Sequence, residues 1–192
     1  MKQLLIALGL LLLTATAPAP AAEIHGVMLT ERIQLAANQA ELVLNGAGIR
    51  VFGFMKIYLA ALYLPAKMDN SETILRADQP SRLMLRMLRD ISAEQLKSSV
   101  RKALHSTLTP EQRAPLQPRL DQLYAMFDSL KELPRDSQIV IDYLPQIGTV
   151  VRVNGEEKGR FPGADFNHAL LRIWIGERPR DPQLREAMLG IR

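Results

Sequence analysis

The segment Met55-Lys56-Ile57-Tyr58-Leu59-Ala60-Ala61-Leu62-Tyr63-Leu64 lies between Gly53 and Pro65, and it decides the fold class. Its apolar and aromatic content, with chain-breaking residues at both ends, predicts one long β-strand. Alternate residues of a strand point to opposite faces of its sheet, and here both sets are largely apolar. We therefore expect a sheet that is covered on both faces or that lines a cleft.

The rest of the chain changes between strand and helix patterns in a definite order. We expect a strand at 82–89, helices that begin at capping boxes at 92–95 and 109–112, a helical stripe at 120–130, strands at 138–144 and 149–153, a tight turn at Asn154-Gly155, and helices at 164–175 and 181–190. Strands, then helices, then strands and helices again predict an α+β domain, with helices packed on an antiparallel sheet.

The first 22 residues have the pattern of a signal peptide. Lys2 precedes an apolar run from Leu4 to Leu13, and Ala19-Pro20-Ala21 has the small residues of a cleavage site. The run is shorter than the ~20 residues that a spanning helix needs. We expect cleavage after Ala21 or Ala22, one domain over residues 23–192, and no stable membrane span afterwards. An uncleaved anchor is the alternative.

Composition narrows the class of protein further. The chain is 47% hydrophobic and 23% charged, which is too apolar for intrinsic disorder. It has no cysteine, so disulfide scaffolds, thiol nucleophiles and thioether-linked haem are excluded. Export without cysteine predicts a periplasmic protein that is held together by packing alone. The formal net charge of +4 is spread among many acids, so we expect no nucleic-acid partner.

Two stretches carry a family resemblance. One is Leu44-Asn45-Gly46-Ala47-Gly48-Ile49-Arg50 with the strand that follows it, and the other runs from Val153-Asn154-Gly155 through Phe161-Pro162-Gly163 to Ile173-Trp174-Ile175-Gly176-Glu177-Arg178-Pro179. Together they resemble the chalcone isomerase superfamily, and its exported bacterial chalcone isomerase-like branch most of all. This resemblance implies an open-faced β-sandwich, in which helices cover one face of a large antiparallel sheet and a ligand cleft lies between the layers.

The resemblance also implies which residues would do chemistry. In plant chalcone isomerases an Arg of this Gly-rich segment, a Thr on the next strand, and a Tyr and an Asn near the first helix close a phenol onto an enone. The Arg is present here as Arg50, but the Thr position carries Tyr58, and the other two positions fall at Leu96 and Ala103. Cyclisation needs several placed donors, so we expect the pocket to persist without the isomerase activity.

Non-catalytic relatives of this fold bind fatty acids, and the same Arg holds the carboxylate. We therefore predict a periplasmic, non-catalytic protein that binds a small apolar carboxylate such as a fatty acid, because a guanidinium offers a carboxylate two parallel hydrogen bonds. The candidate ligand-binding residues are Arg50, Tyr58, Asn167 and Lys56. One alternative is an intramolecular lyase or isomerase for an unidentified enone, with Arg50 and Tyr58 acting on it. Another is an envelope-assembly role through protein contacts.

Other candidate sites have simpler interpretations. His25, His105 and His168 lack metal-ligand spacing, and Gly46-Ala47-Gly48 lacks the third glycine of a dinucleotide motif, so we expect no metal and no cofactor. Arg50 could be a surface residue beside a Gly-rich turn. The arginines of the C-terminal region are expected on a solvated face, and they are residues 172, 178, 180, 185 and 192.

Overall fold

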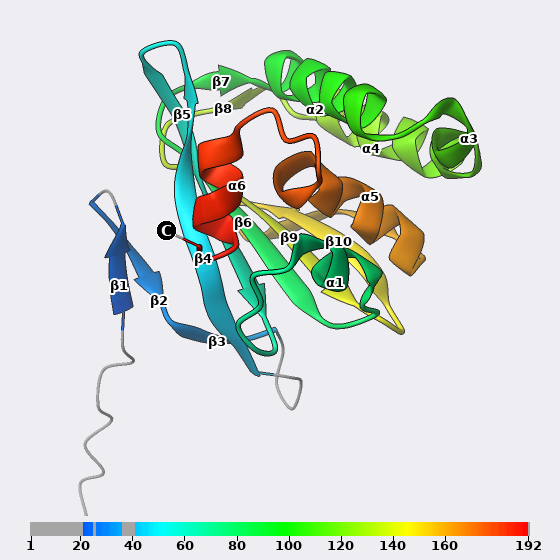
Figure 1. Cartoon of the computed structure of the whole chain (residues 1–192). Coiled ribbons are helices and arrows are strands. Elements are labelled where there is room, and N and C mark those ends of the chain that lie inside the picture. Colours follow the sequence, from blue (N-terminus) through cyan, green and yellow to red (C-terminus); the bar gives the residue numbers. More distant parts are fainter. Residues whose placement is uncertain (1–20, 25, 36–40, 192) are drawn as a thin grey trace, which may run out of the picture.

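The large antiparallel sheet that the sequence predicts is the centre of the structure. The computed structural model describes residues 21–24, 26–35 and 41–191. Within these residues seven antiparallel strands form the main sheet in the order β11-β10-β9-β6-β5-β4-β3 (Figure 1). The α+β prediction is confirmed, and so is the open-faced arrangement with helices on one face of the sheet.

The predicted strands and helices occur in the expected order, and β1 to β4, α1, β7 and β8 are additional to the prediction. The strands are β1 (Ala21–Ile24), β2 (Val27–Thr30), β3 (Arg32–Gln34), β4 (Glu41–Phe52), β5 (Met55–Leu64), β6 (Ser81–Met87), β7 (Ile91–Ser92), β8 (Glu132–Leu133), β9 (Gln138–Leu144), β10 (Gly148–Val153) and β11 (Glu156–Phe161). The helices are α1 (Ser71–Arg76), α2 (Ala93–Thr107), α3 (Pro110–Arg113), the 3-10 helix η1 (Ala114–Leu116), α4 (Gln117–Ser129), α5 (Ala164–Ile175) and α6 (Pro182–Met188).

Strand β5 is buried on both faces, as its sequence predicts. Ala60, Leu62 and Leu64 belong to the larger core, which lies between the sheet and the helices. The alternate residues, including Leu59 and Tyr63, belong to a second core that the β1–β2 hairpin covers from the other side. Because both faces are occupied, β5 fixes the sheet between the two cores.

The Gly-rich segment before Arg50 lies inside strand β4 and is not a turn, so that part of the sequence interpretation is wrong. A bulge between Leu44 and Gly46 turns the side chain of Asn45 into the core, where it is 4% exposed. Its Nδ2 donates hydrogen bonds of 2.9 Å to the carbonyl oxygens of Met68 and Met188, and its Oδ1 accepts one of 2.7 Å from Met68 N. Asn45 therefore joins β4 to the end of α6.

The two glycines of this segment allow α6 to lie directly on β4. A Cβ at Gly46 would stand 2.1 Å from the carbonyl oxygen of Ala187, and one at Gly48 would stand 2.8 Å from the Ala187 Cβ. Neither distance is compatible with van der Waals packing. The glycines are thus required by close approach, and α6 lies against β4, the strand that carries Arg50 (Figure 1).

The predicted leader falls almost entirely outside the described residues. Strand β1 begins at Ala21 and pairs with β2, so cleavage after Ala22 would remove its first two residues. The boundary between leader and domain stays a prediction. Across residues 21–24, 26–35 and 41–191, no helix combines the length and the apolar character that crossing a bilayer requires.

Substitution of Gly46 tests this packing. We expect Gly46→Ala to lower the free energy of unfolding by about 3 kcal/mol, because the new methyl group meets backbone of α6 that cannot move alone. Urea unfolding followed by circular dichroism measures the change.

A matched control is Gly53→Asn in the β4–β5 turn. Gly53 has a φ of +60°, which Asn tolerates, and its Cβ would meet open space. Its cost should stay within about 0.5 kcal/mol of the wild type. Equal stability of Gly46→Ala and the wild type would contradict the close approach.

Candidate functional site

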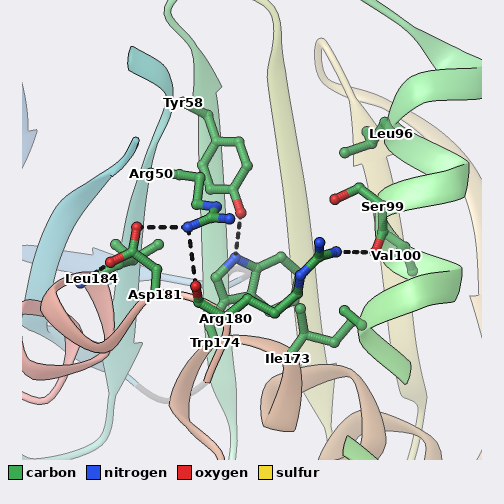
Figure 2. A pocket seen from close by; sticks show the side chains of 11 residues that line it. Arg50, Tyr58, Leu96, Ser99, Val100, Ile173, Trp174, Arg180, Asp181 and Leu184 are labelled. Atoms are coloured by element: carbon green, nitrogen blue, oxygen red, sulfur yellow. Dashed lines mark hydrogen bonds and ion pairs between the residues drawn. The ribbon is translucent and has the colours of Figure 1, made fainter. Parts of the chain in front are cut away.

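A pocket lies at the end of the sheet where β4 and β5 meet the helices (Figure 2). Strands β4 and β5, helices α2 and α5, and the start of α6 contribute its walls, with lining residues Arg50, Tyr58, Leu96, Ser99, Val100, Ala103, Ile173, Trp174, Arg180, Asp181 and Leu184. Its volume is about 40 Å³, enough for one or two water molecules. The inner pocket is therefore small.

A larger cavity of about 420 Å³ continues from this inner pocket towards the surface, and the two share five lining residues: Arg50, Tyr58, Leu96, Ser99 and Arg180. Its further walls come from the apolar side chains of Phe52, Met55, Ile57 and Ile91, together with Arg89, Asp90 and Gln95. Cavities of this size and apolar character hold small organic ligands. The inner pocket and the outer cavity together form the candidate site.

Arg50 and Asp181 form an ion pair at the wall of the inner pocket. Arg50 Nη1 donates a 2.9 Å hydrogen bond to Asp181 Oδ2, and the two side chains are only 19% and 16% exposed. The same nitrogen lies 3.4 Å from the carbonyl oxygen of Arg180. Among the described residues, Nη1 is the one nitrogen of this guanidinium that makes hydrogen bonds, which leaves Nε and Nη2 for a ligand.

Asp181 holds this pair in place because it also caps α6. Its Oδ1 accepts a 3.0 Å hydrogen bond from Leu184 N, and its Oδ2 accepts a longer one from Val51 N. Burial opposes the ionisation of this carboxyl. Nevertheless, the hydrogen bonds from Leu184, Arg50 and Val51, together with the guanidinium charge, hold its pKa below the usual value.

Tyr58 lies directly opposite Arg50 in the β4–β5 register, so both side chains are on the same face of the sheet. Its hydroxyl accepts a 3.0 Å hydrogen bond from Trp174 Nε1. Burial raises the pKa of Tyr58, and it outweighs the opposing effects of Trp174 and Arg50. Tyr58 is therefore a neutral O–H donor near neutral pH and a poor general base.

Two further arginines line the outer cavity. Arg180 donates a 3.5 Å hydrogen bond from Nη1 to the carbonyl oxygen of Ser99, which links the loop before α6 to α2 (Figure 2). Arg89 follows β6, and its Nη1 contacts Met55 Sδ. Within the described part of the chain neither guanidinium forms an ion pair with a carboxylate, so the cavity has a net positive lining.

The structure brings together two of the four predicted ligand-binding residues. Arg50 and Tyr58 line both compartments. Lys56 is exposed near the β4–β5 turn, and Asn167 is buried on α5 at 3% exposure; neither is among the lining residues of this site. The apolar replacements Leu96 and Ala103 do lie in the wall of the inner pocket.

Sequence reasoning missed Asp181 and Arg180 as site residues. Arg185 donates to the carbonyl oxygens of Ile175 and Gly176, so the predicted solvated face is wrong for this arginine. Arg180 is exposed, as predicted, but it also lines the outer cavity. Asp181-Pro182 was a visible helix-start signal. Nothing in the sequence showed that this start would meet Arg50.

Comparison with known proteins supports the fold. A family model described as chalcone isomerase-like matches residues 21–190. The chain belongs to this chalcone isomerase-like family. A crystal structure of a fatty-acid binding protein from Arabidopsis thaliana has the same fold, with a TM-score of 0.73 at 16% identity, over 90% of this chain and 97% of that one. No curated protein matches the chain.

The next question is whether side chains of this chalcone isomerase-like chain could bind a metal ion. Among the residues that the structure describes, no group of three or more His, Asp or Glu side chains could hold an ion. The chemistry that the site can support is hydrogen bonding and charge pairing, from Arg50, Arg180 and the Tyr58 hydroxyl, against apolar walls.

The Asp181 pair makes stability depend on pH. Because its pKa is lower in the folded protein, Asp181 stabilises the fold above its unfolded pKa of about 3.9, and this contribution disappears as the pH falls through the lower folded pKa. Asp181→Asn keeps the helix cap but removes the charge. We expect it to cost about 1–2 kcal/mol near pH 7 and to cost progressively less below about pH 4.

Urea unfolding of both proteins between about pH 7 and pH 2 measures this difference. Other carboxyl groups titrate in both proteins, so only the gap between the two curves reports Asp181. A gap that stays constant down to the lowest pH would contradict the assignment.

Proposed function

We propose that this protein is a periplasmic, non-catalytic binding protein for a small apolar carboxylate such as a fatty acid. The observation that carries the proposal is the cavity of about 420 Å³, which has apolar walls and three arginines, Arg50, Arg89 and Arg180, in its lining. The Arabidopsis thaliana relative of the same fold is a fatty-acid binding protein, which supports the same class of ligand.

The carboxylate of the ligand would bind at the junction of the two compartments. Nη2 and Nε of Arg50 have no partner among the described residues and can form a two-point contact with a carboxylate. Arg180 adds a second positive charge, and the Tyr58 hydroxyl can donate, because it accepts from Trp174 and makes no donor contact within the described part of the chain. Asp181 orients the guanidinium through Nη1 alone and leaves its other nitrogens available to the ligand.

The apolar part of the ligand would lie in the outer cavity. Phe52, Met55, Ile57 and Ile91 offer it a wall without strong hydrogen-bonding groups. Burial of methylene groups there contributes about 0.8 kcal/mol each, so chain length would set much of the affinity. The small inner pocket would exclude a bulky head group.

Leu96 and Ala103 stand at the two positions where plant chalcone isomerases carry a Tyr and an Asn, and this difference supports binding without turnover. Both side chains are apolar and face the inner pocket, where they cannot hold a developing oxyanion. With Tyr58 neutral and Arg50 paired, the site stabilises a charge that already exists on the ligand. The carboxylate in its wall, Asp181, already accepts hydrogen bonds from Arg50, Leu184 and Val51.

The first test is native mass spectrometry of the protein expressed with its own leader, followed by solvent extraction of any bound molecule. We expect a carboxylic acid in the wild type and an N-terminus close to residue 22 in the periplasmic fraction. An empty protein that also fails to bind added fatty acids would overturn the proposal. Intact leader in the cytoplasmic fraction alone would overturn the location.

The second test is substitution of the arginine fork. Arg50→Lys keeps a positive charge for Asp181 but loses the planar pair of donors, so we expect fatty-acid binding to weaken about tenfold to a hundredfold while the fold persists. Titration calorimetry measures the affinity. Arg160→Lys, on the far edge strand β11, is the matched control and should bind like the wild type.

Two results would contradict the assigned role of Arg50. One is unchanged affinity in a folded Arg50→Lys protein. The other is consumption of an enone substrate that depends on Arg50 and Tyr58, since this would make the protein an isomerase or lyase. Absorbance of the conjugated enone follows that turnover directly.

A further inference from the structure

Exposed apolar side chains gather at the turn between β4 and β5. In the described residues seven large apolar side chains are exposed, and four of them lie within residues 51–55. Phe54 is fully exposed and Phe52 is 63% exposed, while Val51 and Met55 are each more than 40% exposed. Single exposed apolar residues are common on soluble proteins, but a cluster of this kind usually marks an interaction surface.

The geometry of the turn holds these side chains outward. Phe52 pairs with Met55, which makes Gly53 and Phe54 a two-residue turn, and Gly53 provides the positive φ that such a turn needs. The β4–β5 hairpin extends beyond the neighbouring strands at one end of the sheet (Figure 1). Turn positions normally carry small polar residues, so two phenylalanines there favour an apolar environment.

Basic side chains surround this apolar tip. Lys56 follows Met55 and is exposed, and Arg89 is exposed with its guanidinium against the Met55 sulfur. Neither forms an ion pair with an acidic side chain of the described chain. The acidic neighbour Asp90 accepts a 2.7 Å hydrogen bond from Arg135 N and keeps its charge, so two basic side chains stand against one carboxylate here. The tip is therefore apolar with a positive rim.

We propose that the β4–β5 hairpin docks this protein on an anionic lipid bilayer. Phe52 and Phe54 enter the boundary between head groups and acyl chains, and Lys56 and Arg89 contact lipid phosphates. Apolar side chains in the interface combined with basic residues near it are the two contributions that give a peripheral protein its membrane affinity. The positive rim and the apolar tip lie close enough together to act at one surface.

The positive rim argues against a second copy of the chain as the occupant. A two-fold dimer through this tip would place Lys56 and Arg89 near the same residues of its partner, and like charges would then oppose association. An anionic bilayer neutralises the same charges. The charge pattern therefore favours lipid over self-association.

Docking in this orientation has a consequence for the candidate site. Phe52, Met55 and Arg89 also line the outer cavity, so its mouth would face the lipid surface. If the proposed function holds, an acyl ligand could pass between bilayer and cavity without crossing open water. The docking itself does not depend on any ligand, so it can be tested separately.

Vesicle flotation tests the proposal with protein expressed with its own leader and recovered after processing. Wild type is mixed with vesicles of phosphatidylethanolamine and phosphatidylglycerol, or of phosphatidylcholine alone. We expect stronger binding to the anionic vesicles. Phe52→Ser combined with Phe54→Ser should lower binding to both kinds at least about tenfold, because two apolar anchors are lost.

A second pair of substitutions separates charge from apolar insertion. Lys56→Gln and Arg89→Gln should each lower binding to anionic vesicles about fivefold and leave binding to phosphatidylcholine unchanged. The control is Ile147→Ser in the β9–β10 turn. Ile147 is also exposed, but the strand register places it at the opposite end of the sheet, so this variant should bind like the wild type.

Failure of wild type to float with either vesicle would overturn the proposal, and so would equal flotation of the double serine variant, once circular dichroism shows that it is folded. Sedimentation velocity without lipid identifies the other occupant. A wild-type dimer that the serine variant cannot form, combined with no vesicle binding, would assign the tip to a second copy. Ligand extraction from the wild type alone reports the proposed function, because Phe52 and Arg89 also line the outer cavity.

Discussion

The direct packing of helix α6 on strand β4 is the constraint on which the rest of the site depends. Backbone meets backbone at Gly46, where no side chain could fit, and Asn45 adds a buried hydrogen bond to the carbonyl oxygen of Met188 at the end of α6. Because the helix is fixed at this end, its first residues must lie over Arg50. The ion pair with Asp181, the loop that carries Arg180 and the small inner pocket all follow from that position.

This packing changes the meaning of the Gly-rich motif. A Gly-x-Gly-x-Arg segment suggests a loop that approaches a ligand, but here the glycines approach a helix and only the arginine reaches the pocket. One strand therefore carries both the glycines that pack against α6 and the arginine that lines the pocket. Arg50 is held by Asp181 on one side and presents its other nitrogens to the cavity. Because this side chain is already ordered before a ligand binds, binding would cost little of its conformational entropy.

Much of the fold could be predicted because the long elements have clear periods. The strand at 55–64 and the helices that start at Ser92 and Thr109 are confirmed, since apolar alternation and capping boxes are local signals. The β1–β2 hairpin and α1 are too short to show a period. Asp181 could not be assigned to the site because its role depends on a contact between residues 131 positions apart. Lys56 was placed by strand alternation, yet the turn beside it carries it out to solvent.

The indole of Trp174 has a further consequence. It is the only tryptophan in the chain, it is 6% exposed, and it donates its N–H to the Tyr58 hydroxyl in the wall of the inner pocket. Almost all the long-wavelength ultraviolet fluorescence of this protein therefore originates at the candidate site. The emission of the unlabelled molecule is a local signal, and its wavelength and intensity report the polarity and hydrogen bonding of that pocket.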